Sequence, residues 1–263
     1  PERRSHMERL RTEQPKGLTR AGIRKWGMLF LILGMFGRSI ILNCYLGFDN
    51  LTGDQLLNAM NTDSDVMAAV TFALISLFVE ACGVPIFCFL LSEGMVHTSN
   101  ASYYMARIFG VAAISEIPYN LAISSKFIDL SSRNPAFGLV LSFVLLLLSR
   151  RYMEKKPVNV LLRVAFVVAA VLWSRMLSIA DAGAMVIMTT AFWAFRNKPN
   201  FRTMVACGAA GICVTMSMFY LAAPMSAFAI NLYNGEPGTQ NRAFNYAAYP
   251  LALLCFGIAV MFL

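Results

Sequence analysis

"VMAAVTFALISLFVEACGVPIFCFLLS", Val66 to Ser92, is an almost unbroken run of apolar residues whose only charged side chain is Glu80. A helix needs about 20 consecutive apolar residues to cross the hydrocarbon core of a bilayer. This run is long enough, and Pro85 is expected to bend the helix because proline removes a helical hydrogen bond. The stretch therefore predicts a bent membrane-spanning helix.

Similar apolar runs recur through the rest of the chain. Hydrophobic residues make up 58% of the 263 residues and charged residues only 14%, which is typical of a polytopic membrane protein and excludes an ordinary soluble domain. We expect an all-α transmembrane bundle of about eight membrane helices, with a basic N-terminal segment (1–25) and a single integral membrane domain (26–263). The expected helices cover 26–46, 66–92, 103–123, 135–149, 158–178, 182–195, 203–230 and 244–263.

Lysine and arginine are concentrated before the first helix and in the connections 150–157 and 196–202. Because positive residues favour the cytoplasmic side, we expect both termini in the cytoplasm and the protein in a bacterial inner membrane. The segment from Glu93 to Asn100 would then be cytoplasmic, with the loop from Asn231 to Arg242 on the other side. This orientation accounts for the net charge of +8, so a nucleic-acid partner is not expected.

Glu93 and His97 form a polar pair just after the quoted run. They are four residues apart, so on a continuous helix they share a face and the carboxylate can reach the imidazole. Such a carboxylate can orient a histidine as a general base. The alternative is a plain helix end, in which Gly94 ends the helix and His97 meets solvent or lipid headgroups.

Ionisable residues inside membrane helices are costly and usually face a partner or a water-filled cavity. The candidates are Arg38, Glu80, Arg107, Glu116, Arg163, Arg175 and Asp181. For Arg163 and Arg175 a structural role is favoured. Glu80 has no partner near it in the sequence and precedes Pro85, as Glu116 precedes Pro118. Two bent helices carrying carboxylates could frame a site, and helix packing without function is the alternative. The six cysteines lack paired metal-ligand spacing, so no metal site is expected.

Several blocks resemble one known family, the TraX-like membrane proteins. They are "PIFCFLLSEGMVHTSNASYYMARIFGVAAISEIPYN" from Pro85 to Asn120, "ADAGAM" from Ala180 to Met185, "LYNGEPG" from Leu232 to Gly238 and "YPLAL" from Tyr249 to Leu253. The family is related to polytopic membrane acyltransferases. The resemblance therefore implies acyl transfer, with acetyl-CoA or a related acyl-CoA as donor.

The chain departs from the family pattern at three places. Family members usually carry an Asp-His pair in the first membrane helix, where this chain has Met35 and Phe36. They also carry a histidine in the last helix, where this chain has Ala252. In the second helix, an arginine that commonly precedes the proline is replaced by Glu80 or Ala81. Met35, Phe36 and Ala252 cannot accept a proton. The base would therefore have to be His97, or catalysis would be absent.

Three functions are compatible with these residues. The first is an integral membrane acyltransferase that transfers an acetyl group to an amine or hydroxyl of a membrane-associated acceptor, with His97 as base and Glu93 orienting it. The second is a catalytically inactive family member that serves as a membrane binding or assembly subunit, and the third is a small-solute transporter. For the first function, the expected substrate-binding residues are Arg107, Glu116, Asp181, Tyr233 and Asn234. Arg107 would hold a donor phosphate.

Overall fold

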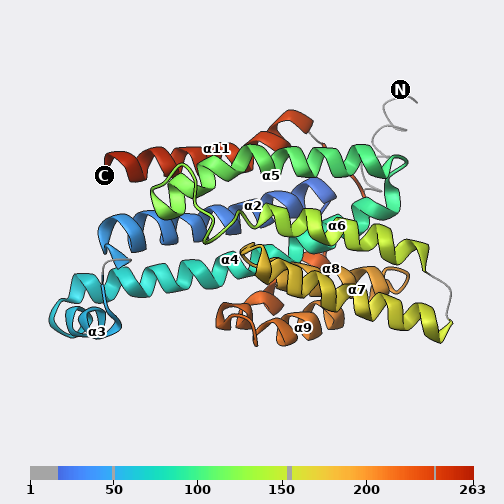
Figure 1. Ribbon diagram of the computed structural model, residues 1–263, viewed down its shortest axis with the longest axis horizontal. Coiled ribbons are helices and arrows are strands. Elements are labelled where there is room, and N and C mark those ends of the chain that lie inside the picture. Colours follow the sequence, from blue (N-terminus) through green and yellow to red (C-terminus); the bar gives the residue numbers. More distant parts are fainter. Residues whose placement is uncertain (1–16, 49–50, 153–155, 240) are drawn as a thin grey trace, which may run out of the picture.

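The computed structural model describes residues 17–48, 51–152, 156–239 and 241–263, and this part of the chain is an elongated helical bundle without a β-strand (Figure 1). The prediction of an all-α fold is confirmed. Seven of the eight expected membrane segments are helices whose ends lie within a few residues of the predicted ones. The elements are α2 (Arg20–Phe36), η1 (Gly37–Tyr45), α3 (Gly53–Thr62), α4 (Ser64–His97), α5 (Ala101–Ser124), α6 (Ala136–Arg151), α7 (Pro157–Met176), α8 (Ala182–Ala194), η3 (Pro199–Phe201), α9 (Arg202–Cys213), η4 (Met218–Leu221), η5 (Ala223–Met225), α10 (Ser226–Asn231) and α11 (Arg242–Phe262).

Four helices in the described part of the chain are long and apolar enough to cross a membrane. They are the continuous α2–η1 helix, α4, α7 and the part of α11 from Phe244 to Phe262. Large apolar side chains lie on their outer faces, as Leu161 and Leu172 of α7 show with exposed fractions of 69% and 57%. A soluble protein rarely exposes continuous apolar surface of this kind. These features indicate a membrane protein, and its exposed apolar faces are compatible with a surrounding lipid bilayer.

The α2–η1 helix packs closely against α4, and the two run antiparallel. Three glycines of the first helix, Gly27, Gly34 and Gly37, face α4, and a Cβ atom at any of them would come within 2.9 Å of an α4 side-chain atom. Small residues let membrane helices approach in this way. Gly34 lies opposite Glu80, so the close packing determines where this carboxylate is placed.

The segment 203–230, predicted as one membrane helix, is a helical hairpin instead. α9 ends near the middle of the bundle, two short 3-10 turns (η4 and η5) reverse the chain, and α10 runs back beside α9. Pro224 lies in η5, where its missing N–H and fixed φ favour a new start over a continuous helix. Tyr220 and Ile230 are buried. One face of the hairpin therefore packs into the core, whereas large apolar side chains such as Met204 and Phe228 stay exposed. The segment reverses within the bundle and does not continue as one helix.

The hairpin brings the loop after α10 back to the start of α2. There the Leu18 N–H donates to the Leu232 carbonyl at 2.7 Å, and the Asn234 N–H donates to the Leu18 carbonyl at 3.0 Å. This is the same end of the bundle as the Glu93 end of α4. The prediction that the loop and Glu93 lie on opposite sides is therefore wrong, because it assumed one crossing too many.

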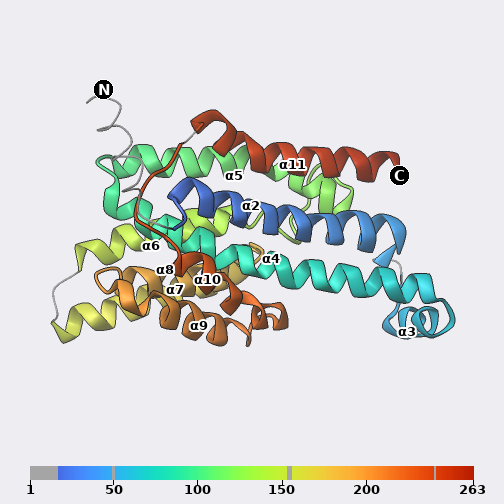
Figure 2. The same ribbon diagram turned by 180° about the vertical axis from the view of Figure 1, so that it is seen from behind.

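Because the segment 203–230 reverses, the first and the last described residues lie at opposite ends of the bundle. α11 runs parallel to α5, with Tyr246 near Arg107 at one end and Gly257 against Leu121 further along. It ends at Phe262, at the opposite end of the bundle from the start of α2 (Figure 2). This arrangement differs from the prediction that both termini share one side. Residues 1–16 of the predicted basic segment lie outside the described residues.

Candidate functional site

A cavity of about 190 Å³ lies between α2, α4, α5 and α6, next to the starts of α8 and α11. Most of its wall is apolar, with side chains such as Met28, Leu90 and Ile108. Polar side chains gather at its two ends. The inner end holds Glu80 and Asp181, deep in the bundle. The other end, near the starts of α2, α5 and α11, is called the mouth and is formed by Arg24, Tyr104, Arg107 and Tyr246.

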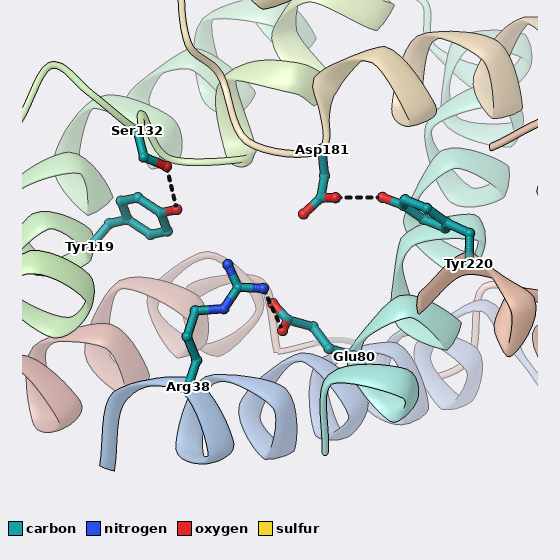
Figure 3. Close-up of polar contacts among 6 residues, drawn as sticks. All are labelled: Arg38, Glu80, Tyr119, Ser132, Asp181 and Tyr220. Carbon is teal, nitrogen blue, oxygen red and sulfur yellow. Dashed lines mark hydrogen bonds and ion pairs between the residues drawn. The ribbon is translucent and has the colours of Figure 1, made fainter. Parts of the chain in front are cut away.

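Glu80 at the inner end pairs with Arg38 across the helix interface (Figure 3). The distance from Arg38 Nη2 to Glu80 Oε2 is 3.3 Å. Arg38 lies at the start of η1, a π-helical continuation of α2, and such segments are frequent at functional sites. Because a buried carboxylate is costly without a partner, Arg38 makes it possible for Glu80 to line an apolar cavity.

Asp181 reaches the inner end through an uncommon backbone conformation. Its φ of 56° lies in the left-handed region, which residues other than glycine rarely adopt. Just before it, the Ser178 carbonyl accepts the Arg133 N–H at 2.7 Å, so two loops hold the segment in place. The Asp181 side chain does not cap α8 but accepts a hydrogen bond from the Tyr220 hydroxyl at 2.7 Å, and it faces the same space as Arg38 (Figure 3). Backbone strain at a polar site of this kind supports a functional role.

Glu116, a predicted substrate-binding residue, contacts the loop before α6. Its Oε2 accepts the backbone N–H of Asn134 at 3.1 Å, and Asn134 Oδ1 accepts the Tyr249 hydroxyl at 2.7 Å. The hydroxyls of Tyr119 and Ser132 share a hydrogen bond at 3.3 Å in the same region (Figure 3). Tyr249 lines the cavity and Glu116 does not. Glu116 therefore does not contact the cavity directly, but hydrogen bonds through Asn134 connect it to Tyr249 in the cavity wall.

Arg107, also predicted to bind substrate, lies at the mouth. Its Nη1 donates to the Tyr246 hydroxyl at 3.2 Å, and its Cζ lies 4.5 Å from the centre of the Tyr103 ring. Arg24 lines the cavity from α2. The mouth is therefore positively charged and rich in tyrosine, unlike the carboxylate-bearing inner end.

Glu93 and His97 lie outside this cavity. α4 continues through Gly94 to His97, and His97 Nε2 is 3.5 Å from Glu93 Oε2, as the four-residue spacing predicts. The His97 side chain is 55% exposed. The other Glu93 oxygen lies 3.8 Å from Arg202. Gly94 does not end the helix; its missing side chain leaves room for the Tyr104 ring.

Tyr233 and Asn234 lie near the Glu93 end of α4. The Tyr233 ring packs against Phe89 with 5.4 Å between ring centres, and Arg202 Cζ lies 5.6 Å from the centre of the Tyr233 ring. Asn234 Oδ1 accepts the Glu236 N–H at 3.0 Å, which is the side-chain contact that asparagine commonly makes in a turn. Tyr233 therefore packs next to Arg202 and also accepts a hydrogen bond from Arg20 at 3.4 Å. Asn234 shapes the loop.

Six of the seven predicted site residues thus fall into two groups, and Glu116 belongs to neither because it contacts the loop before α6. Glu93, His97, Tyr233 and Asn234 lie near the end of α4, where Arg202 contacts Glu93 and Tyr233. Arg107 and Asp181 lie at opposite ends of the cavity. Sequence reasoning did not single out Arg24 or Tyr220. Arg24 is one of many basic residues that orient the chain, and Tyr220 lies in an apolar run without any motif. Only their three-dimensional neighbours distinguish them.

A family profile described as TraX protein matches residues 57–260. The chain belongs to the TraX family. No curated protein and no solved structure matches it. Both groups of predicted site residues of this TraX-family chain lie within the matched range, whereas Arg24 and Arg38 precede it.

Proposed function

We propose that this TraX-family chain is an integral membrane acyltransferase. It would move an acetyl group from acetyl-CoA, or from a related acyl-CoA, to an amine or hydroxyl of a membrane-associated acceptor. The observation that carries the proposal is the position of the Asp181 carboxylate at the inner end of an apolar cavity with a positively charged mouth. Such a cavity admits the narrow acyl-bearing end of a donor and limits access of water to the reacting carbonyl.

Asp181 is well placed to take the proton of the attacking group. Tyr220 occupies one carboxylate oxygen, and the other makes no hydrogen bond to a described residue. As the acceptor nitrogen or oxygen bonds to the thioester carbonyl carbon, its proton passes to Asp181. The C–S bond then breaks, and the departing sulfur takes that proton. The positive charge of Arg38 would oppose the negative charge that develops on the carbonyl oxygen.

His97 is the competing base. Glu93 can orient it, but Arg202 also contacts Glu93, and neither member of the pair lines the cavity. A donor held in the cavity would react beside Asp181. A reaction at His97 would instead take place at the exposed end of α4. Substitution of the two residues separates these alternatives.

The test is transfer of radiolabelled acetyl from acetyl-CoA to native membrane components by the purified protein in nanodiscs. Asp181→Asn should lower the rate by about a hundredfold or more, the usual contribution of a general base, while His97→Ala should stay close to the wild-type rate. Asp129→Asn is the matched control. Ser131 donates hydrogen bonds of 2.9 and 2.7 Å to Asp129 and thereby lowers its pKa to about 2, so Asp129 stays ionised throughout the assay range.

Two results would contradict the proposal. Loss of transfer in His97→Ala with full activity in Asp181→Asn would move the reaction to the end of α4. Absence of any acetyl transfer by the wild-type protein, with membrane components from the source cell present as acceptors, would remove the acyltransferase assignment and favour a binding or assembly role.

A further inference from the structure

Three arginines converge at the mouth of the cavity. Arg20 and Arg24 are one helical turn apart on α2, and Arg107 lies on α5. All three are electrostatic neighbours of Tyr104. None of the three forms an ion pair with a carboxylate in the described part of the chain. The mouth therefore concentrates positive charge, and no acidic side chain among the described residues forms an ion pair with it.

The hydrogen-bond donors of these arginines are only partly used. Arg20 Nη2 donates to the Tyr233 hydroxyl at 3.4 Å, and Arg107 donates to Tyr246. The Nε atoms of Arg20 and Arg107 are buried and have no partner among the described residues. Partly buried like charges with free donors are costly. A multivalent anion would remove that cost, and the planar guanidinium group suits phosphate oxygens.

The shape of the cavity limits what such an anion can be attached to. Arg24 and Met35 both line the cavity from α2 and are 11 residues apart. At a rise of 1.5 Å per residue the cavity extends about 16 Å from mouth to inner end. Pockets for drug-sized ligands hold roughly 300–1,000 Å³, so the volume of about 190 Å³ fits a narrow chain and not a nucleotide.

We propose that the mouth binds the phosphate groups of an amphiphilic ligand whose narrow chain enters the cavity. The inference rests on the proposed function, in which this ligand is the acyl donor. The phosphates lie at Arg24 and Arg107, the chain passes along the apolar wall, and the reactive carbonyl reaches Asp181. The nucleotide part of a coenzyme A donor stays outside, against Tyr104 and Tyr246.

Phosphate groups with an attached chain occur in coenzyme A and in anionic phospholipids, and the two sources can be separated by experiment. Binding of coenzyme A and of inorganic pyrophosphate is measured by calorimetry on the whole protein in phosphatidylcholine nanodiscs. Retention of phosphatidylglycerol is measured in parallel by native mass spectrometry after extraction from mixed nanodiscs. The variants are Arg24→Gln and Arg107→Gln, and the matched control is Arg175→Gln on the exposed end of α7.

Each mouth substitution should weaken coenzyme A or pyrophosphate binding about tenfold or more, as expected for the loss of one charge-assisted hydrogen bond. Arg175→Gln should bind as the wild type does. Arg24→Lys keeps the charge but loses the planar fork, and should give an intermediate affinity. If the lipid headgroup is the source, phosphatidylglycerol retention will depend on Arg24 and Arg107 in the same way.

The proposal is overturned if neither coenzyme A, pyrophosphate nor phosphatidylglycerol binds in a manner that depends on Arg24 or Arg107. Its failure can be told from failure of acyl transfer, since Asp181→Asn should bind coenzyme A like the wild type while transferring acetyl about a hundredfold more slowly. Arginine-dependent binding without transfer in the wild type would retain the anion site and refute the acyltransferase. Transfer that is unaffected by Arg24→Gln and Arg107→Gln would refute the anion site alone.

Discussion

Substitution of Gly34 by alanine tests the helix contact that places Glu80 in the cavity wall. A Cβ atom at Gly34 would lie 2.6 Å from both Cγ and Oε2 of Glu80, and closer still to its Cβ. Ordinary contacts between carbon atoms are about 3.5–4.0 Å. Either the α2–η1 helix and α4 must separate by about 1 Å, or the Glu80 side chain must turn away from Arg38.

The magnitude follows from two opposing terms. Overpacking of a closely packed site costs about 1–3 kcal/mol, whereas alanine is intrinsically better than glycine in a helix by about 1 kcal/mol. Gly110→Ala carries only the second term, because Gly110 is also within a helix and a Cβ there would meet nothing within 4 Å. The difference between the two variants therefore isolates the cost of overpacking. We expect Gly34→Ala to be less stable than Gly110→Ala by about 1–3 kcal/mol.

Thermal unfolding in detergent, followed with a thiol-reactive dye, measures this difference. Cys82, Cys88 and Cys213 are buried and become reactive on unfolding, while Cys207 and Cys255 are exposed and set the baseline. A shift of about 2–4 °C per kcal/mol for a chain of this size predicts that Gly34→Ala unfolds roughly 2–12 °C below Gly110→Ala. Equal unfolding temperatures, together with unchanged acetyl transfer, would refute the close contact as the feature that positions Glu80.

Two further predictions concern the re-entrant hairpin. Tyr220→Phe removes the hydrogen bond to Asp181 and should lower the stability by about 1 kcal/mol. It should also lower the kcat of acetyl transfer by more than this loss of stability explains, which is checked by comparing kcat with the unfolding temperature. An unchanged kcat would mean that Tyr220 does not position Asp181. In a background without native exposed cysteines, Ser99→Cys and Glu236→Cys should react with a membrane-impermeant maleimide from the same side of sealed vesicles, and Lys126→Cys from the other. If Glu236→Cys were instead labelled from the same side as Lys126→Cys, the segment 203–230 would cross the membrane as one continuous helix, as the sequence predicted.

Local sequence pattern was sufficient for much of this fold. The run from Val66 to Ser92 contains too many apolar residues for any soluble surface, and its expected helix agrees with α4 apart from a few residues at each end. The Glu93–His97 contact also follows from helical spacing alone. Such features depend on neighbours within one or two turns, and these neighbours are visible in the order of residues.

The hairpin of α9 and α10 was not predictable by the same reasoning. The segment 203–230 is apolar enough to cross a membrane, and hydropathy does not distinguish a crossing from a buried reversal. Its conformation depends on the tertiary packing of residues such as Tyr220 and Ile230, which are buried in the core. The predicted positions of the Asn231–Arg242 loop and of the last helix end depended on that one decision. The structure places both at the other end of the bundle from the predicted one.

The sequence by itself determined the helical membrane architecture, the family and the candidate ionisable residues, because composition and short-range periodicity are properties of the chain alone. Only the tertiary structure decided which of those residues share a site. It paired Glu80 with Arg38, placed Asp181 beside Tyr220 at the inner end of the cavity, and separated both from His97. The physical reason is that contacts between helices depend on how closely the helices approach and how they are rotated about their axes. Glycines such as Gly34 and the reversal at Pro224 set these relations, and the residue pattern of a single helix does not reveal them.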